Sequence, residues 1–311
     1  MTIENFRLTV FRTVAKHLSF SRAAEELLLT QPAVTQQIKA LEQEFGVPLF
    51  QRAGGRISLT QAGTALLPFA EDIRSLSQQA FAAVSKAVGQ TAGELSVGAS
   101  QTIAQYLLPT FLAAFLQRNP QVRVTARSGN TDQMLHALVS GDVQVALLEG
   151  PEQRTDVHIE PFMEDHMVLV VPSSHEWAGQ KVTLDELRSQ PLLTREFGSG
   201  SRRVVEQALI EAGLKTKDLS IRMALDTTEG LLNAVEAGLG VTFVSRWAVR
   251  NQLALGTLKV AQVDGLKLSR SFSFAYPAGP EPSGSAGAFR TFLLGHAAAV
   301  SPRRARKVQV S

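Results

Sequence analysis

The sequence contains no cysteine, and its 311 residues include two tryptophans and two tyrosines. Disulfide bonds, thiol-based redox sensing and cysteine-ligated zinc are therefore excluded. No apolar run is long enough to span a bilayer. Glu4, Arg7 and Arg12 also interrupt any signal-peptide pattern near the N-terminus. We therefore expect a cytoplasmic location.

An excess of charge is also lacking. Charged residues make up 19% of the chain and hydrophobic residues 44%, which is an ordinary globular balance. The formal net charge is +3, and the basic residues of segment 301–311 alone exceed that sum. We expect this segment to be a basic disordered tail, which could add salt-sensitive DNA affinity. The length of the chain predicts two or three domains.

Residues 20–52 have the pattern of a winged helix-turn-helix: two short amphipathic helices, a tight turn between them and a hairpin afterwards. Ser21 is expected to cap the first helix and Thr30 the second, which tolerates Pro32 in its first turn. Gly46 fits the end of the second helix. An earlier helix is expected to pack behind this pair. The residues predicted to face their common core are Phe6, Val10, Phe11, Val14, Ala23, Ala24, Leu27, Val34, Ile38, Leu41 and Phe45.

The opposite face of the second helix is rich in amides and hydroxyls. Gln can bond an adenine edge, Thr can bond a base or touch a thymine methyl group, and Lys suits phosphate. The hairpin around Gly54 and Gly55 would place arginines beside the phosphates. An ordinary solvated face is the alternative, but acids are scarce here before Glu42. The candidate DNA-contacting residues are Ser21, Arg22, Thr30, Gln31, Pro32, Thr35, Gln36, Lys39, Arg52 and Arg56.

A long helix is predicted from the cap Thr60 to about Ala87, with a kink at Pro68. One alternative is that its apolar stripe faces a core. Its position between two domain-like blocks favours a dimerisation helix, and a dimer would supply two DNA-contacting units for a two-fold site. A hinge is expected at 89–93. The apolar residues with heptad spacing are Leu66, Phe69, Ile73, Leu76, Ala80, Ala83 and Ala87.

From Gly93 onward, predicted strands alternate with predicted helices. This alternation indicates mostly parallel sheets with helices on both faces, and the length of the segment suits two lobes. The expected strands are 95–99, 122–127, 143–148, 159–162, 167–171, 192–194, 221–225, 241–244, 258–260 and 272–276. The expected helices are 103–118, 134–139, 202–212, 231–237 and 286–297.

Polar residues follow several of these strands. Ligands of open α/β sheets gather at the carboxyl ends of strands, and a helix N-terminus attracts anions. Hydroxyls, amides and an arginine suit a small oxyanion such as sulphite or sulphate, or a carboxylate. Helix capping is the alternative, and we favour it for Asn130 and Thr228. Glu149 would repel an anion, so we expect it to pair with Arg202 or Arg195, or to shape the hinge.

The order of these parts resembles a LysR-type transcriptional regulator over nearly the whole chain, excepting the basic tail. The motifs that carry the resemblance are Phe11-Arg12-Thr13-Val14-Ala15, Ser19-Phe20-Ser21-Arg22-Ala23-Ala24, Thr30-Gln31-Pro32-Ala33-Val34-Thr35, Leu41-Glu42, Gly46-Val47-Pro48-Leu49-Phe50-Gln51-Arg52 and Leu59-Thr60-Gln61-Ala62-Gly63. The resemblance implies a homotetramer with a periplasmic-binding-protein-like (type 2) effector domain. A small molecule would bind between its lobes and change how DNA is bound and bent.

Three further stretches resemble the sulphur-assimilation and sulphite-responsive branch, and carbon-fixation operon regulators share much of this pattern. The stretches are Gly98-Ala99-Ser100-Gln101-Thr102-Ile103, Leu148-Glu149-Gly150-Pro151 and Arg195-Glu196-Phe197-Gly198-Ser199-Gly200-Ser201-Arg202. For Ser100, Thr102 and Ser201 the family position favours a ligand. The candidate effector-binding residues are Ser100, Gln101, Thr102, Asn130, Thr131, Glu149, Arg195, Gly198, Ser199, Ser201, Arg202 and Thr227.

An enzyme is the principal alternative, because Glu164-Asp165-His166 could perform acid–base chemistry. Adjacent residues on a strand point to opposite faces, so these three do not converge on one substrate. The sequence also lacks H-x-x-H metal spacing, a P-loop and G-x-S-x-G. We therefore expect no catalysis, no metal and no cofactor.

The sequence thus predicts an α/β protein with an N-terminal all-α winged helix-turn-helix. The expected parts are a DNA-binding domain (1–60), a linker or dimerisation helix (61–90), an effector domain (91–300) and the tail (301–311), with lobe I at 91–162 and 268–300 and lobe II at 163–267. The partners expected are promoter DNA, an anionic effector, a second copy through 61–87 and, for an activator, RNA polymerase. The main hypothesis is control by sulphite or sulphate; the alternatives are an organic or phosphorylated metabolite, or effector-independent DNA bending.

Overall fold

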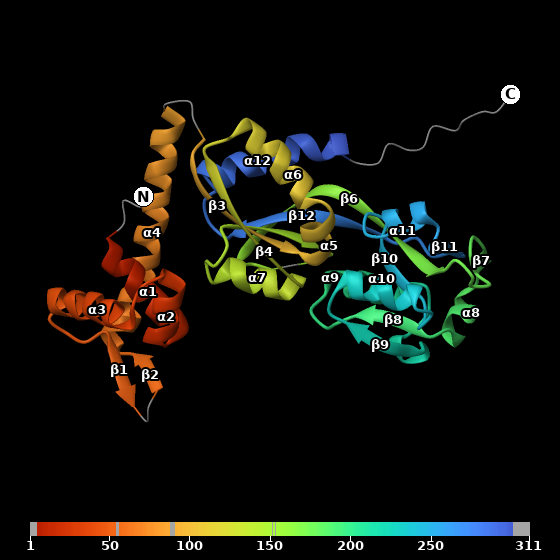
Figure 1. The fold of residues 1–311 in the computed structure, drawn as a ribbon, viewed down its shortest axis with the longest axis horizontal. Helices are drawn as coiled ribbons and strands as arrows, with labels where there is room; N and C mark the ends of the chain where they lie inside the picture. Colours follow the sequence, from red (N-terminus) through yellow and green to blue (C-terminus); the bar gives the residue numbers. More distant parts are fainter. Residues whose placement is uncertain (1–4, 54–55, 88–90, 151, 153, 301–311) are drawn as a thin grey trace. The chain divides into compact units, whose positions relative to one another are not determined.

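The computed structural model describes residues 5–53, 56–87, 91–150, 152 and 154–300. The chain divides into two compact units, Met1–Gln90 and Thr91–Ser311, here named the N-terminal unit and the C-terminal unit (Figure 1). The predicted Gly54-Gly55 turn, Pro151, residues 89 and 90 of the predicted hinge and the basic tail lie outside the described residues. No helix in the described ranges combines the length and the hydropathy that a membrane span requires.

The N-terminal unit contains three helices packed together, a hairpin and a long helix. In chain order these are α1 (Phe6–His17), α2 (Phe20–Leu27), α3 (Gln31–Phe45), β1 (Phe50–Ala53), β2 (Arg56–Leu59) and α4 (Gln61–Ala87). The strands pair antiparallel, with Ala53 opposite Arg56. This is the helix-turn-helix and wing that the sequence predicts.

Polar residues fix the ends of these helices. The Thr30 side chain accepts a hydrogen bond from the Ala33 N–H at 3.4 Å at the start of α3, and Gly46 ends that helix at φ 69°. The predicted cap Ser21 is wrong. Ser19 caps α2 and accepts from the Arg22 N–H at 3.3 Å, because the helix already begins at Phe20.

One hydrophobic core holds the three helices, the hairpin and the start of α4 together. Phe6 and Phe45 were expected in this core but are about half exposed, with values of 50% and 52%. They lie at the first residue of α1 and the last of α3, where no neighbouring helix covers them. The buried core residues are Leu8, Val10, Phe11, Val14, Ala23, Ala24, Val34, Ile38, Leu41, Leu49, Phe50 and Ala70.

Helix α4 begins where predicted, because the Thr60 hydroxyl accepts from the Gly63 N–H at 3.0 Å. Leu66 packs against the core of the N-terminal unit, whereas Phe69, with 64% of its surface accessible, and Leu76 face solvent. Most of the predicted heptad stripe is therefore apolar surface that the unit itself leaves uncovered. Ala87 ends α4, and its side chain is outside the described set.

The C-terminal unit is α/β. Its strands are β3 (Gly93–Ser100), β4 (Val122–Gly129), β5 (Val145–Glu149), β6 (Val157–Pro172), β7 (Lys181–Val182), β8 (Leu192–Arg195), β9 (Ile221–Leu225), β10 (Thr242–Ser245), β11 (Leu258–Val263) and β12 (Ser269–Pro277). Its helices are α5 (Gln101–Tyr106), α6 (Leu108–Arg118), α7 (Thr131–Val139), α8 (Leu184–Ser189), α9 (Gly200–Glu211), the 3-10 turn η1 (Thr216–Asp218), α10 (Thr228–Glu236), α11 (Arg250–Leu255) and α12 (Gly284–Val300).

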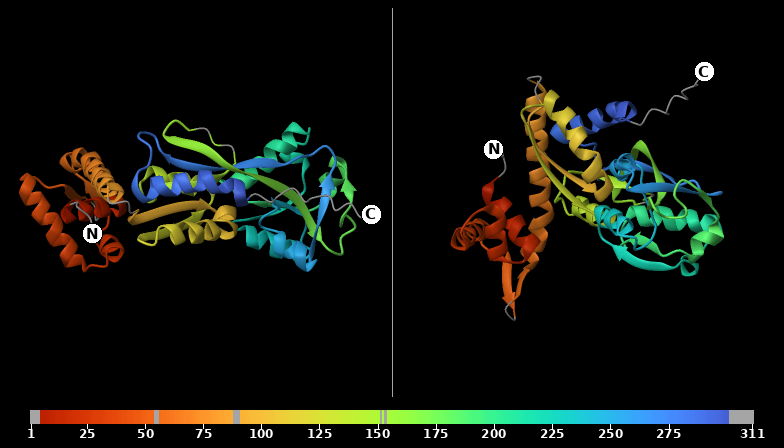
Figure 2. Two further views of the ribbon diagram at one scale, coloured as in Figure 1. Left: turned by 90° about the horizontal axis from the view of Figure 1, so that it is seen from above. Right: turned by 45° about the vertical axis from the view of Figure 1, so that its right-hand side comes forward.

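The main sheet has the order β4-β3-β5-β12-β6-β11-β7, with β10 also paired to β6, and β8-β9 form a separate pair. Pairs β3-β4, β3-β5 and β8-β9 are parallel, as predicted. The expectation of a mostly parallel arrangement is wrong in the centre, because β12 runs antiparallel to both β5 and β6, and β6 antiparallel to β10 and β11. Strands β6 and β12 connect the two ends of the unit (Figure 2).

Both faces of the sheet are covered, which explains its apolar strands. In β5, Val145 and Leu147 belong to a cluster with α5, α6 and α12, while Ala146 and Leu148 belong to another with α7. We name the part of the unit built on these two clusters lobe I. Two further clusters are built on β6 residues 167–171, with α9 on one face and α10 on the other, and we name this part lobe II.

Several predicted elements differ from the structure. The predicted helix 103–118 is two helices that meet at Leu107, because Pro109 supplies no N–H to continue the first one. The predicted strands 159–162 and 167–171 are one strand, β6. Of the two acidic residues between them, Asp165 is buried inside the strand in an ion pair with Arg270. Elements β7, α8, η1 and α11 were not anticipated, and they are short.

Candidate functional site

The outer face of α3 presents polar side chains to solvent. Gln31, Gln36 and Lys39 are exposed, and Thr35 is partly exposed. The Gln31 amide donates to the Thr35 hydroxyl at 2.9 Å, and that hydroxyl donates to the Gln31 carbonyl at 3.0 Å. An amide and a hydroxyl are thus held together in the first turn of the helix, where helix-turn-helix proteins contact base edges.

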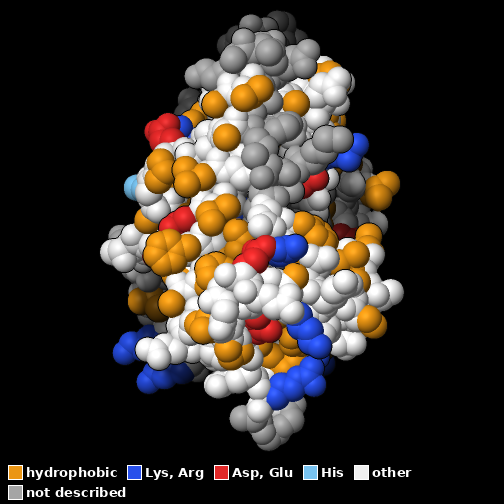
Figure 3. All heavy atoms as spheres, turned by 90° about the vertical axis from the view of Figure 1, so that its left-hand side faces the viewer, with side chains coloured by type: hydrophobic (Ala, Val, Ile, Leu, Met, Phe, Trp, Pro, Cys, Tyr) orange, Lys and Arg blue, Asp and Glu red, His pale blue; other side chains and the backbone are white. Residues whose placement is uncertain are grey.

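The wing adds positive charge beside this helix. Arg52 and Arg56 are exposed on β1 and β2, and the Arg52 guanidinium lies 5.8 Å from the centre of the Phe20 ring. Glu42 is the first acid on α3, and its carboxylate accepts a hydrogen bond from the Leu49 N–H at 2.8 Å. In Figure 3, basic side chains gather toward the end of the face where the hairpin lies. The remaining candidates Ser21, Arg22, Thr30 and Pro32 are also exposed.

The candidate effector residues of lobe I lie at the carboxyl ends of three parallel strands. Ser100 ends β3 and pairs in register with Gly129, the residue before Asn130, while Glu149 ends β5. Ser100 is fully buried, and its Oγ has no hydrogen-bond partner in the described part of the chain. Gln101 has an unpartnered buried Oε1, and Thr102 is buried.

Two predicted caps can be compared with the structure. Asn130 caps α7, as favoured, and accepts from the Gln133 N–H at 2.9 Å in a capping box. Thr228 is not a cap; its hydroxyl accepts from Arg195 Nη1 at 3.0 Å. Thr227, an effector candidate, caps α10 instead and accepts from the Gly230 N–H at 3.0 Å.

The Thr131 side chain, at the start of α7, links lobe I to the start of α9 in lobe II. Its hydroxyl donates to the Glu149 carbonyl and accepts from the Gly200 N–H, both at 3.2 Å. A Cβ at Gly200 would lie 1.8 Å from the Glu149 carbonyl oxygen, so only glycine fits there. The Gly-Ser-Gly stretch therefore permits close contact between lobe I and α9, and Ser199 caps that helix.

Glu149 does not pair with Arg202 or Arg195, as the sequence suggested. It lies 2.7 Å from Arg270 Nη2 and accepts from the Ser201 hydroxyl at 3.2 Å. Arg270 Nε also donates to Asp165 at 2.8 Å, and Arg270 Nη1 donates to Ser201 at 2.8 Å. Burial raises the pKa of Asp165 above its usual range, and the Arg270 charge opposes that rise.

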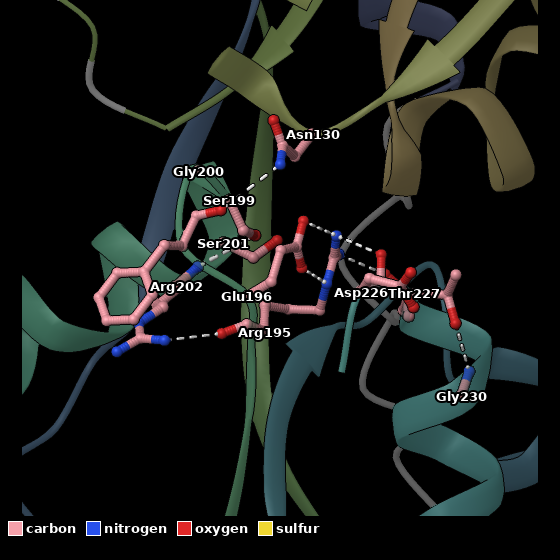
Figure 4. Close-up of polar contacts among 12 residues, drawn as sticks. Asn130, Arg195, Glu196, Ser199, Gly200, Ser201, Arg202, Asp226, Thr227 and Gly230 are labelled. Atoms are coloured by element: carbon pink, nitrogen blue, oxygen red, sulfur yellow. Dashed lines mark hydrogen bonds and ion pairs between the residues drawn. The ribbon is translucent and has the colours of Figure 1, made fainter. Parts of the chain in front are cut away.

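Arg195 holds a second set of polar contacts, drawn in Figure 4. Its guanidinium donates twice to the carboxylate of Glu196, from Nε at 2.8 Å and from Nη2 at 3.1 Å. Nη2 also donates to the Asp226 carbonyl at 3.1 Å. Arg202 donates from Nη1 to the Arg195 carbonyl at 3.1 Å, and its guanidinium lies 3.9 Å from the centre of the exposed Phe197 ring.

The loop before α9 also contacts lobe I. The Asp132 N–H donates to the Gly198 carbonyl at 3.3 Å, and the Asn130 amide donates to the Phe197 carbonyl at 3.4 Å. Arg203 is half-buried and pairs with Asp132 at 3.1 Å. Residues 197, 198 and 203 therefore bond directly to the start of α7 in lobe I.

Two family descriptions cover the chain. "Bacterial regulatory helix-turn-helix protein, lysR family" matches residues 6–64, and "LysR substrate binding domain" matches residues 89–298. The chain belongs to the LysR family. It is a DNA-binding transcription regulator with an effector-binding domain, and the family is one of regulators, not enzymes.

Relatives of this LysR-type regulator include carbon-fixation regulators. A "Probable RuBisCO transcriptional regulator" of Trichormus variabilis is 34% identical over 292 residues, which are 93% of this chain and 87% of the relative. Full-length CbnR in complex with its target DNA has a TM-score of 0.61 at 24% identity, covering 96% of this chain and 99% of CbnR. The Synechocystis PCC6803 CcmR regulatory domain in complex with 2-PG has a TM-score of 0.62 at 22% identity, covering 67% and 99%.

The sequence did not point to some residues that the LysR-type fold brings together. Arg270 and Ser245 complete the buried cluster around Asp165, and the Ser245 hydroxyl donates to Asp165 at 2.8 Å. Tyr106 of α5 donates to Glu229 of α10 at 3.0 Å, which links the lobes elsewhere. Arg270, the only charged residue of its strand, was the available signal, because a buried cation needs a buried acid.

Proposed function

We propose that this LysR-type regulator binds a phosphorylated or carboxylated organic metabolite between its two lobes, and that this binding changes how it engages promoter DNA. The observation that carries the proposal is the Ser100 hydroxyl, which is fully buried without a hydrogen-bond partner among the described residues. A buried hydroxyl left unpaired costs free energy, and a ligand oxygen that pairs with it recovers that cost. Ser100 lies at the strand ends where α/β proteins bind ligands.

An organic anion is favoured over sulphite or sulphate, the main hypothesis from the sequence. The relative from Trichormus variabilis is named a RuBisCO regulator, and the CcmR domain was solved with 2-PG bound. Arg195 and the starts of α7 and α9 provide donors for an anionic group. The proposed effector-binding residues remain Ser100, Gln101, Thr102, Asn130, Thr131, Glu149, Arg195, Gly198, Ser199, Ser201, Arg202 and Thr227.

Thermal unfolding of the full chain tests this proposal, with 2-PG, inorganic phosphate, sulphite, sulphate and simple carboxylates added in turn. A ligand that binds the folded state stabilises it by about 2.7 kcal/mol at roughly 100 times its Kd. We expect 2-PG or a carboxylate to stabilise the protein more than sulphite or sulphate does. Stabilisation by sulphite or sulphate alone would restore the earlier hypothesis.

Ser100→Ala should remove most of this ligand-dependent stabilisation. Ser96→Ala is the matched control, because Ser96 lies on the same strand and its hydroxyl already donates to the Asp142 carbonyl at 3.2 Å. Equal ligand responses in the two variants would place the effector away from Ser100. If no compound stabilises the wild type, effector-independent DNA bending becomes the better hypothesis.

For DNA, we propose that the first turn of α3 contacts base edges in the major groove and that the wing arginines contact phosphates. Gln31 and Thr35 supply paired polar groups for the bases, while Arg52 and Arg56 supply charge. The proposed DNA-contacting set is Ser21, Arg22, Thr30, Gln31, Pro32, Thr35, Gln36, Lys39, Arg52 and Arg56.

We further propose that 61–90 is a linker helix that dimerises through its exposed heptad stripe, and that two dimers form a tetramer. Phe69, Ile73 and Leu76 are exposed large apolar residues at heptad spacing, the pattern of a helix–helix interface. Ile73→Glu should lower the mass measured by sedimentation velocity, whereas Gln79→Glu, outside the stripe, should not. An activator would in addition contact RNA polymerase.

A further inference from the structure

We propose that Glu196 is an internal anion that occupies the Arg195 guanidinium until the anionic group of the effector replaces it. The inference rests on the effector function proposed above and deepens it by naming the anchor of the anion and its built-in competitor.

Arg195 is placed to bind an anion in a fixed orientation. Its side chain is 3% exposed, and two groups of lobe II hold its guanidinium: the Thr228 hydroxyl at 3.0 Å and the Asp226 carbonyl at 3.1 Å. Those contacts leave the edge formed by Nε and Nη2, which donates to both carboxylate oxygens of Glu196. This two-pronged geometry is the one by which arginine recognises carboxylate and phosphate groups alike.

Glu196 is the partner that can leave. Its side chain is 23% exposed, and its carboxylate bonds to Arg195 and to no other described residue. Strand β8 ends at Arg195, so the side chain of Glu196 folds back from the residue that follows the strand. Figure 4 shows the pair between the start of α9, with Ser199 and Ser201, and the Asp226-Thr227 turn.

Exchange of one carboxylate for another anion keeps the charges balanced. A buried arginine left without a counter-ion is strongly destabilising, so an empty anion site at Arg195 would be costly. Glu196 removes that cost in the ligand-free protein, while its own charge returns to solvent when the effector binds. Neutral metabolites lack the two acceptor oxygens needed to replace it, so the exchange selects for anions.

The exchange also has a path to lobe I. Residues 197 and 198, which follow Glu196, carry the two carbonyls that accept hydrogen bonds from Asn130 and Asp132. Release of Glu196 therefore changes the position of the segment that hydrogen-bonds the loop before α9 to the start of α7. Effector binding and lobe contact are linked through this one side chain.

The test is isothermal titration calorimetry of the full chain, which measures the Kd for inorganic phosphate and for 2-PG. In Glu196→Gln the competing charge is gone and the size is kept, so we expect the Kd for each anion to fall by about tenfold. Glu160→Gln is the matched control: the Glu160 carboxylate also accepts two hydrogen bonds from one arginine, Arg290, and its side chain is 28% exposed, yet neither residue belongs to the proposed effector-binding set. Its Kd values should equal those of the wild type. Arg195→Met should abolish binding in either background.

The outcomes separate the two proposals. If the wild type binds 2-PG and Glu196→Gln binds it no more tightly, the internal-anion proposal is overturned and the effector function stands. If neither protein binds either anion, the effector function for this anion class fails and the inference fails with it. Should Glu196→Gln not fold, Glu196→Asp replaces it; its carboxylate is too short to fold back onto both nitrogens, and an unchanged Kd there again overturns the proposal.

Discussion

The candidate DNA-contacting residues differ from the candidate effector-binding residues in exposure and in the distance along the chain to their hydrogen-bond partners. In the N-terminal unit, Gln31 and Thr35 bond to each other within one helical turn and are open to solvent. In the C-terminal unit, Ser201 and Arg195 are buried and bonded to residues far along the chain. A DNA duplex can meet the first set without disturbing the protein, whereas a ligand must exchange partners with the second. We therefore expect the DNA-binding surface to keep one structure, while effector binding changes the contact between the lobes.

The largest expected effect comes from breaking the buried cluster. Arg270→Met would leave the carboxylates of Glu149 and Asp165 buried without their shared cation. We expect a loss of about 3–5 kcal/mol in the unfolding free energy of the C-terminal unit, measured by urea denaturation, with the N-terminal unit unaffected. A loss below about 1 kcal/mol would contradict the role given to this cluster.

Two comparisons sharpen that result. Arg290→Met removes a more exposed pair with Glu160, and it should cost less than about 1 kcal/mol. The pKa of Asp165 is raised by burial, so its contribution to stability is present in acid and declines as pH rises through that raised pKa. Lowering the pH should therefore recover part of the stability that Arg270→Met loses, because protonation removes the unpaired charge.

A second prediction separates the close lobe contact from helix formation. Gly200→Ala places a Cβ 1.8 Å from the Glu149 carbonyl oxygen, so α9 must move away from β5. We expect a cost of about 1–3 kcal/mol in thermal unfolding and weaker effector-dependent stabilisation. Gly295→Ala, in α12 with no atom within 4 Å of the new Cβ, should be neutral or slightly stabilising. Similar costs at the two positions would mean that the contact is unimportant.

The DNA-contacting face gives the third prediction. Gln31→Ala should weaken binding to a duplex selected by the wild type from a random pool by about 1–3 kcal/mol, and leave binding to random duplex nearly unchanged. Arg52→Ala should weaken both and flatten the dependence of log K on log salt concentration. Electrophoretic mobility shift at several salt concentrations measures both effects. An equal loss on both duplexes for Gln31→Ala would refute a base contact.

The N-terminal unit was largely predictable from the sequence because its signals are local. Caps such as Thr30, the ending glycine Gly46 and the helical spacing of Val34 and Ile38 are set within a few residues. The errors there were of the same kind: Ser21 for Ser19 is a shift by two residues. Phe45 satisfied the helical period but lies at the end of its helix, beyond the reach of the core.

The candidate effector site was predictable only in part, because its contacts join distant segments. Strand ends and helix starts located Ser100 and Asn130 correctly, whereas α9 begins at Gly200, two residues before the predicted start. The partner of Glu149 could not be predicted, since Arg270 comes from a strand that crosses between the lobes, 121 positions later in the sequence. That crossing also explains the central antiparallel pairs that helix–strand alternation does not predict.

The smallest expected effect comes from the turn between α2 and α3, where the backbone of Leu28 has an unfavourable conformation. Leu28 is 93% exposed and adopts φ 55°, a left-handed conformation that costs a branched L-residue about 1–2 kcal/mol. Asn tolerates this conformation, so Leu28→Asn should raise the unfolding free energy of the N-terminal unit by about 0.5–1 kcal/mol. Gly46→Ala, the reverse change at φ 69° with open space around the new Cβ, should lower it by a similar amount. If Leu28→Asn destabilises the unit, the leucine side chain makes a contact that outweighs its backbone strain.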